Sequence, residues 1–135
     1  MFYSTTITVP AGTTEASPVI QRLKLSAGII HIVDVEFRSG TDFRVGVRID
    51  LGGHQVYPTN PDGDLKADGR AIVFGDYLPL AYGENELIIR GYAPTTTYEH
   101  IVYIKVGVLR EDELNLSYKT DSLLNKFFRL VGIIK

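Results

Sequence analysis

Apolar and polar residues alternate with a period of two through most of the first 110 residues of this 135-residue chain. The run "FRVGVRIDL" is the clearest case, because one face would be apolar and the other would hold three charged residues. The apolar face would comprise Phe43, Val45, Val47, Ile49 and Leu51. Side chains of a β-strand point alternately to opposite faces, so this pattern predicts a strand with one buried and one wet side.

Further strands are predicted where apolar runs stop at Gly, Pro, Ser, Asn or Asp. With 43–51, the predicted strands cover residues 3–9, 18–26, 28–37, 54–57, 70–75, 85–92 and 98–109. No helical pattern interrupts them, which excludes a parallel sheet built from strand-helix-strand units. The chain length fits one core. The sequence therefore predicts an all-β fold, an antiparallel β-sandwich whose strand number is that of an eight-stranded jelly roll.

The pattern changes after this predicted 1–110 domain. Residues 111–120 form a polar connector, and residues 121–135 have the apolar periodicity of an amphipathic helix that begins at Thr120 or Asp121. Its apolar stripe comprises Leu123, Leu124, Phe127, Phe128, Val131 and Ile134. Because an isolated helix of this length is marginal in water, the stripe is expected to bind a partner. That partner could be the domain's own sheet, a neighbouring copy, another protein or a membrane surface.

The stretch "GGHQVYPTNPDGDLKADGRAIVF" is rich in Gly, Pro and Asp. As an EF-hand loop it fails at two defining positions, where Leu65 replaces Gly and Ala71 replaces Glu. An irregular calcium site on Asp62, Asp64 and Asp68 remains an alternative, since oxygen-rich loops bind hard cations. Asp-Gly pairs and prolines favour a rigid connection between strands. No Gly-Lys-Ser/Thr follows the glycines, so a phosphate-binding loop is excluded.

Residues with catalytic potential are isolated along the chain. His31, His54 and His100 occur singly, and His31 and His100 fall on apolar strand faces, which favours hydrogen-bonded structural roles. Cysteine is absent, and no Gly-x-Ser-x-Gly motif occurs. We therefore expect no catalysis and no cofactor.

Charge and hydropathy argue against two kinds of partner, nucleic acid and a membrane that the chain would span. The net charge is −2, and basic and acidic residues are interspersed, which disfavours nucleic acid. The N-terminus lacks a secretory-signal pattern, and no apolar run is long enough to span a bilayer.

Tyrosines occur near predicted turns and could form an aromatic surface. They are Tyr57, Tyr77, Tyr82, Tyr92 and Tyr98. Such residues suit protein interfaces, and they also suit a carbohydrate-binding module, in which Tyr57 and Tyr92 would stack on sugars with or without calcium. The absence of tryptophan weakens the carbohydrate alternative.

The runs "GGHQVYPTNPDGDLKADGRAIVFGDYLPL" and "YEHIVYIKVGVL" resemble small single jelly-roll proteins encoded among the structural genes of bacterial and archaeal viruses. The resemblance covers about residues 4–110, and no catalytic residue is carried over. It implies a non-enzymatic virion protein, a capsid or capsid-associated component assembled in the host cytoplasm with further copies and other virion proteins. The C-terminal helix lies outside the resemblance, and we expect it to dock the domain onto a partner.

Overall fold

Eight β-strands form the protein in a computed structural model that describes residues 1–81 and 83–110. They are β1 (Phe2–Val9), β2 (Val19–Leu25), β3 (Gly28–Phe37), β4 (Gly46–Leu51), β5 (His54–Tyr57), β6 (Arg70–Leu80), β7 (Asn85–Tyr92) and β8 (His100–Leu109). The predicted connector 111–120, the predicted helix 121–135 and its apolar stripe lie outside the described residues.

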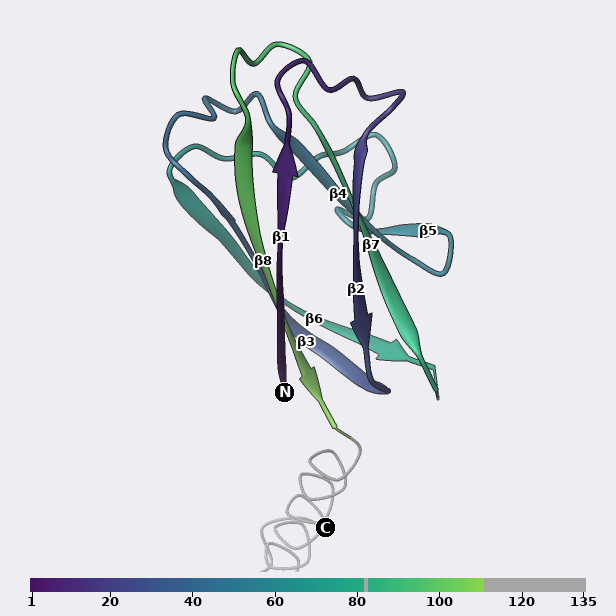
Figure 1. Ribbon diagram of the computed structural model, residues 1–135. Coiled ribbons are helices and arrows are strands. Elements are labelled where there is room, and N and C mark those ends of the chain that lie inside the picture. The colour runs from purple at the N-terminus through teal and green to yellow at the C-terminus, as the bar shows by residue number, and fades with distance from the viewer. Residues whose placement is uncertain (82, 111–135) are drawn as a thin grey trace, which may run out of the picture.

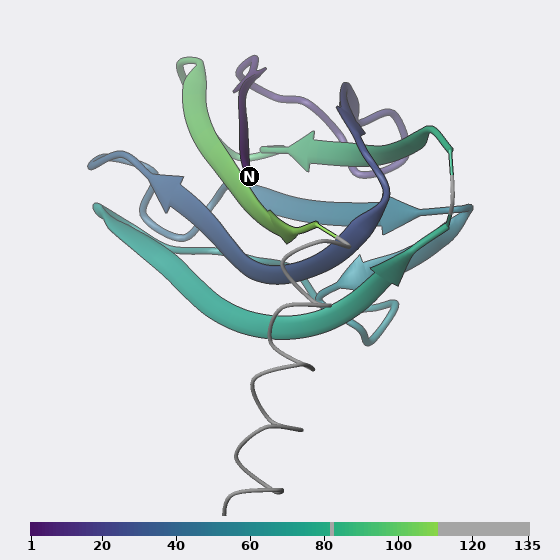
Figure 2. The same cartoon turned by 90° about the horizontal axis from the view of Figure 1, so that it is seen from below.

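The strands form two four-stranded antiparallel sheets that pack face to face (Figures 1 and 2). One sheet has the order β1-β8-β3-β6 and the other has the order β2-β7-β4-β5. The prediction of an all-β sandwich with eight antiparallel strands is confirmed. The loops that follow β1, β3, β5 and β7 lie together at the upper end in Figure 1, while β8 ends at the lower end.

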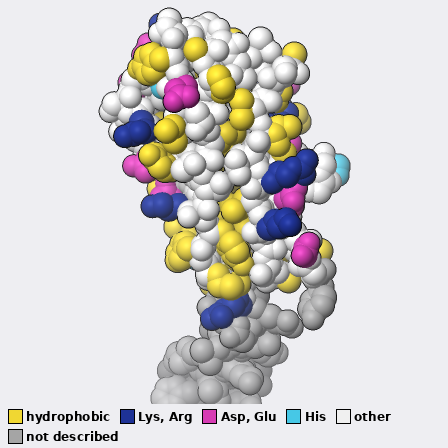
Figure 3. Space-filling view, viewed as in Figure 1, with side chains coloured by type: hydrophobic (Ala, Val, Ile, Leu, Met, Phe, Trp, Pro, Cys, Tyr) yellow, Lys and Arg dark blue, Asp and Glu magenta, His cyan; other side chains and the backbone are white. Residues whose placement is uncertain are grey.

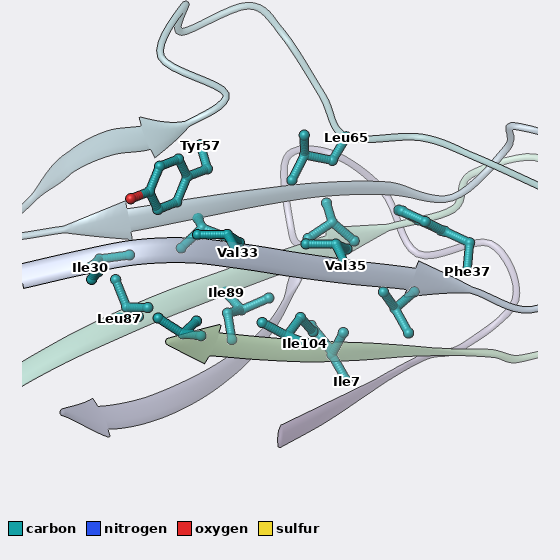
Figure 4. Packing of buried hydrophobic residues seen from close by; sticks show 14 of the residues in the cluster. Ile7, Ile30, Val33, Val35, Phe37, Tyr57, Leu65, Leu87, Ile89 and Ile104 are labelled. Carbon is teal, nitrogen blue, oxygen red and sulfur yellow. The ribbon is translucent and has the colours of Figure 1, made fainter. Parts of the chain in front are cut away.

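Alternation along each strand builds the core between the sheets. In β8, every second residue from His100 to Val108 is buried, as the sequence pattern predicts. Figure 4 shows side chains from both sheets meeting in this layer, among them Val35, Ile89 and Ile104. Each fully buried aliphatic side chain stabilises the fold by about 1.5–3 kcal/mol. Among the described residues, no helix has the length and hydropathy needed to cross a membrane.

The predicted start of the fourth strand is wrong. Asp42 and Phe43 have φ values of 50° and 58°, and Arg44 N donates a hydrogen bond to Thr41 O over 2.9 Å. This is the geometry of a type I′ turn, so β4 begins only at Gly46. Phe43 is therefore exposed, with 55% of its surface accessible, instead of facing the core.

The sixth strand continues past the predicted end at residue 75 to Leu80. Gly75, Asp76 and Pro79 indicated a loop in the sequence. In the structure β6 is an edge strand with a neighbouring strand on one side only. A proline, which has no backbone N–H to donate, is tolerated in such a strand.

Candidate functional site

The loop between β5 and β6 is fastened by side-chain hydrogen bonds. Gln55 Nε2 donates to the carbonyl oxygens of Pro58 and Asn60 over 2.8 and 2.9 Å. Thr41 Oγ1, from the loop after β3, donates to Ala67 O over 2.5 Å. These hydrogen bonds restrict the conformation of the loop, which agrees with the rigid connection expected from the sequence.

The three aspartates of this loop have different environments. Asp64 Oδ1 lies 2.5 Å from Arg48 Nε, and Asp68 Oδ1 accepts a hydrogen bond from Gly40 N over 2.9 Å. Asp62 is exposed. In residues 1–81 and 83–110 no group of three or more His, Cys, Asp or Glu residues is placed to hold a metal ion. Calcium binding by these aspartates stays a prediction, and it would compete with the bonds that two of them make.

Arg48 is the centre of a half-buried charge network on β4. Its guanidinium also lies 2.8 Å from Glu15 Oε1, and its Cζ lies 5.4 Å from the centre of the Tyr92 ring. Burial alone lowers the pKa of Arg48, but the hydrogen bond and charge of Asp64 outweigh burial and hold this pKa above its ordinary value. Burial first, and then the Asp64 carboxylate, raises the pKa of Tyr92 to about 12.

Tyr57 and Tyr92 are only 4% and 7% exposed, so the prediction that they form a sugar platform is wrong. Tyr57 ends β5 with its ring turned inward, 5.2 Å from Phe74 in an edge-to-face arrangement. Its hydroxyl donates to Asp76 Oδ2 over 2.8 Å, and burial followed by this hydrogen bond raises its pKa. Their proximity to turns suggested exposure, but the Tyr57 ring belongs to the core cluster. The Tyr92 ring lies outside that cluster and is covered on the outer face of its sheet, where Arg48 packs on it.

Two adjoining hollows at the loop end share the side chains of Tyr98 and His100. We call them together the Tyr98 groove. The first has a volume of about 510 Å³ and is lined by Arg38, Ser39, Tyr98, Glu99, His100 and Ile101. The second, of about 170 Å³, is lined by Gly40, Asp42, Arg44, Thr96, Thr97, Tyr98 and His100. The groove therefore joins the loop after β3 to the loop before β8.

The histidines do not converge on a site. The His100 ring is buried, with its centre 4.4 Å from that of Tyr98, and it forms the floor of the Tyr98 groove. His31 lies beside Phe2 on β1, with ring centres 6.2 Å apart. His31 Nδ1 is buried and has no hydrogen-bond partner among the described residues, so the hydrogen-bonded role predicted for it is not seen at this atom.

The outer edge of β6 exposes apolar side chains. Within the described part of the chain β6 pairs only with β3, and it is the terminal strand of its sheet. Val73 and Tyr77 on this strand are 55% and 67% exposed. On the face seen in Figure 3, Lys and Arg side chains lie among Asp and Glu side chains and apolar ones. Charge is thus mixed there. The terminal strands β1 and β2 each expose one large apolar side chain, Phe2 and Ile20, whereas β6 exposes two.

No protein-family model and no curated protein matches this chain. The solved structures similar to it include that of FlhE, at 10% identity over 82% of this chain and 97% of that chain, with a TM-score of 0.44. An exo-β-1,3-galactanase from Phanerochaete chrysosporium is similar at 15% identity over 78% of this chain and 27% of the galactanase chain, with a TM-score of 0.40. A family two carbohydrate esterase from Cellvibrio japonicus is similar at 15% identity over 79% of this chain and 34% of the esterase chain, with a TM-score of 0.39. These similarities are too distant to assign a family or a function.

Proposed function

We propose that this protein is a non-enzymatic, self-associating structural component of a virus particle, built on a jelly roll. The two sheet orders, β1-β8-β3-β6 and β2-β7-β4-β5, support the jelly roll, because each sheet alternates strands from the two halves of the chain. Viral capsid domains use this architecture, and so do lectins and cupins, so the fold does not choose among them. The resemblance of residues 4–110 to small virion proteins supports the viral role.

The β6 edge is the observation that carries self-association. A terminal strand presents unpaired backbone N–H and C=O groups, and soluble proteins commonly protect such a strand with lysine or by covering it. The register shift and Pro79 that interrupt β6 fall in its second half, after Gly75. Its first half, residues 70–75, is regularly paired with β3, contains no lysine and exposes Val73. This regular half of the edge is suited to pairing with another strand.

A second copy of the chain fits this edge as the partner. When two β6 strands pair antiparallel with Val73 opposite its counterpart, Arg70 of each copy lies opposite Asp76 of the other. Opposite charges across neighbouring strands stabilise the pair. The arrangement is isologous, as in most two-fold dimers. The C-terminal stripe at Leu123–Ile134 would supply a second contact, to another copy or to another virion protein.

Light scattering of the full chain tests this proposal. Val73→Lys places a charge at the centre of the β6 pairing and should shift the mass toward that of a monomer. Thr6→Lys, on the opposite edge of the same sheet, is the matched control and should leave the mass unchanged. A full chain that is monomeric at every concentration, or an equal effect of both substitutions, would contradict the proposal.

A further inference from the structure

We propose that the Tyr98 groove is a binding site for a neutral saccharide. The proposal is independent of self-association through β6, because two loops and the first residues of β8 line the groove and no residue of β6 does. Its volume, about 510 Å³ in the larger hollow, lies within the range of about 300–1,000 Å³ that small-molecule sites occupy.

Tyr98 offers the apolar surface that a sugar ring requires. Its side chain is 56% exposed, yet it is held on two sides: the His100 ring packs against it, and its hydroxyl donates to Gly40 O over 3.3 Å. Gly40 has a φ of 101°, and a Cβ atom there would lie 2.5 Å from the Tyr98 hydroxyl oxygen. A glycine is therefore needed for the tyrosine to occupy this position. An aromatic ring fixed before binding loses little entropy when a ligand stacks on it.

Polar side chains surround this ring and favour a ligand without net charge. Arg38 and Glu99 line the larger hollow, while Asp42 and Arg44 line the smaller one, where they lie 3.6 Å apart. Each hollow thus holds one cationic and one acidic side chain. A phosphate would meet a carboxylate in either hollow, and a cation would meet an arginine. Hydroxyl groups both donate and accept hydrogen bonds, so a polyhydroxylated neutral ligand satisfies both kinds of side chain.

The surrounding loops hold the groove in shape without a ligand. The loop after β3 is hydrogen-bonded to the loop after β5 through Gly40 and Asp68, and through Thr41 and Ala67. The turn beside the groove also projects Phe43 in the left-handed conformation, which is unfavourable for a bulky residue. Exposed and held in this conformation, Phe43 gives the turn a second aromatic surface next to Asp42 and Arg44.

The test is a titration of the isotope-labelled full chain with neutral oligosaccharides, followed by amide NMR shifts. Cellohexaose, xylohexaose, mannohexaose and maltohexaose are suitable probes, with inorganic phosphate as the charged comparator. At least one saccharide should produce saturable shifts confined to residues 38–44 and 96–101, with a Kd on the order of 0.1–1 mM. Phosphate should produce none.

Substitutions separate stacking from other effects. Tyr98→Ala should weaken binding by at least about tenfold, since the stacking surface is lost. Tyr98→Phe, which keeps the ring, should retain binding, and Tyr77→Ala on β6 should leave it unchanged. The proposal is overturned if no probe gives saturable shifts up to about 10 mM, if the shifts lie elsewhere, if phosphate binds the groove instead, or if Tyr98→Ala binds as the unsubstituted protein does.

Discussion

Two tyrosines show how far the role of a residue depends on where its side chain points. Both Tyr57 and Tyr92 occur at strand ends near turns, and nothing in their neighbours distinguishes them from the exposed Tyr77 and Tyr98. The sequence places each tyrosine at a strand end, but the Tyr57 ring is buried by its entry into the core and the Tyr92 ring by contact with Arg48, which is distant in sequence. Burial raises the pKa of both hydroxyl groups, so a titration can detect that they are buried.

Buried phenols predict a loss of stability at alkaline pH. Tyr57 and Tyr92 have pKa values raised in the folded protein, to about 12 for Tyr92, whereas an unfolded tyrosine titrates near 10. The folded state therefore keeps protons that the unfolded chain releases. This contribution is complete below about pH 10 and is lost as the pH rises toward about 12.

Urea titrations between these pH values should show a falling free energy of unfolding. The slope should be shallower for the double variant Tyr57→Phe/Tyr92→Phe, which has no buried phenol to ionise. The variant Tyr77→Phe/Tyr98→Phe, at exposed positions, should keep the original slope. Equal slopes for all three proteins would show that the buried hydroxyls do not cause the alkaline loss.

At the scale of elements, the alternating pattern located all eight strands because a strand that is buried on one face leaves a period of two. The predicted strand bounds are wrong where a residue type is compatible with both a loop and a strand. Gly75 and Pro79 are of residue types that commonly end a strand, yet an edge strand accommodates both. The Tyr98 groove left no spacing signal, because Arg38 and Glu99 are distant in sequence and meet only through the sandwich topology.

The turn before β4 holds Phe43 in a backbone conformation that is unfavourable for a bulky residue. Phe43 has a positive φ and is exposed, so Phe43→Gly removes backbone strain and loses little packing. We expect the free energy of unfolding to rise by about 1 kcal/mol, measured by chemical denaturation. Arg44→Gly, at the next position and without a positive φ, should give no gain. A Phe43→Gly variant that is less stable would show that Phe43 makes a packing contribution larger than its strain.

At the scale of the whole molecule, the two ends of the sandwich are separated. The four loops lie at one end, and β8 ends at the other (Figure 1). The Tyr98 groove belongs to the loop end, because residues of the loops after β3 and before β8 line it. The antiparallel order enforces this separation, because every second connection returns to the same end. The residues that line the groove and the end of β8 at Leu109 are therefore at opposite ends of the described part of the chain.

The double variant Phe127→Lys/Phe128→Lys in the full chain tests whether the predicted stripe mediates association. It places two charges on the predicted apolar stripe, and a stripe that docks on a partner should then lose association while the melting temperature stays unchanged. Ser122→Lys/Asn125→Lys adds the same charge to the polar side and should associate normally. Light scattering and thermal melts distinguish the outcomes. A lowered melting temperature with unchanged mass would mean that the stripe packs on its own sheet, so that assembly would depend on the β6 edge alone.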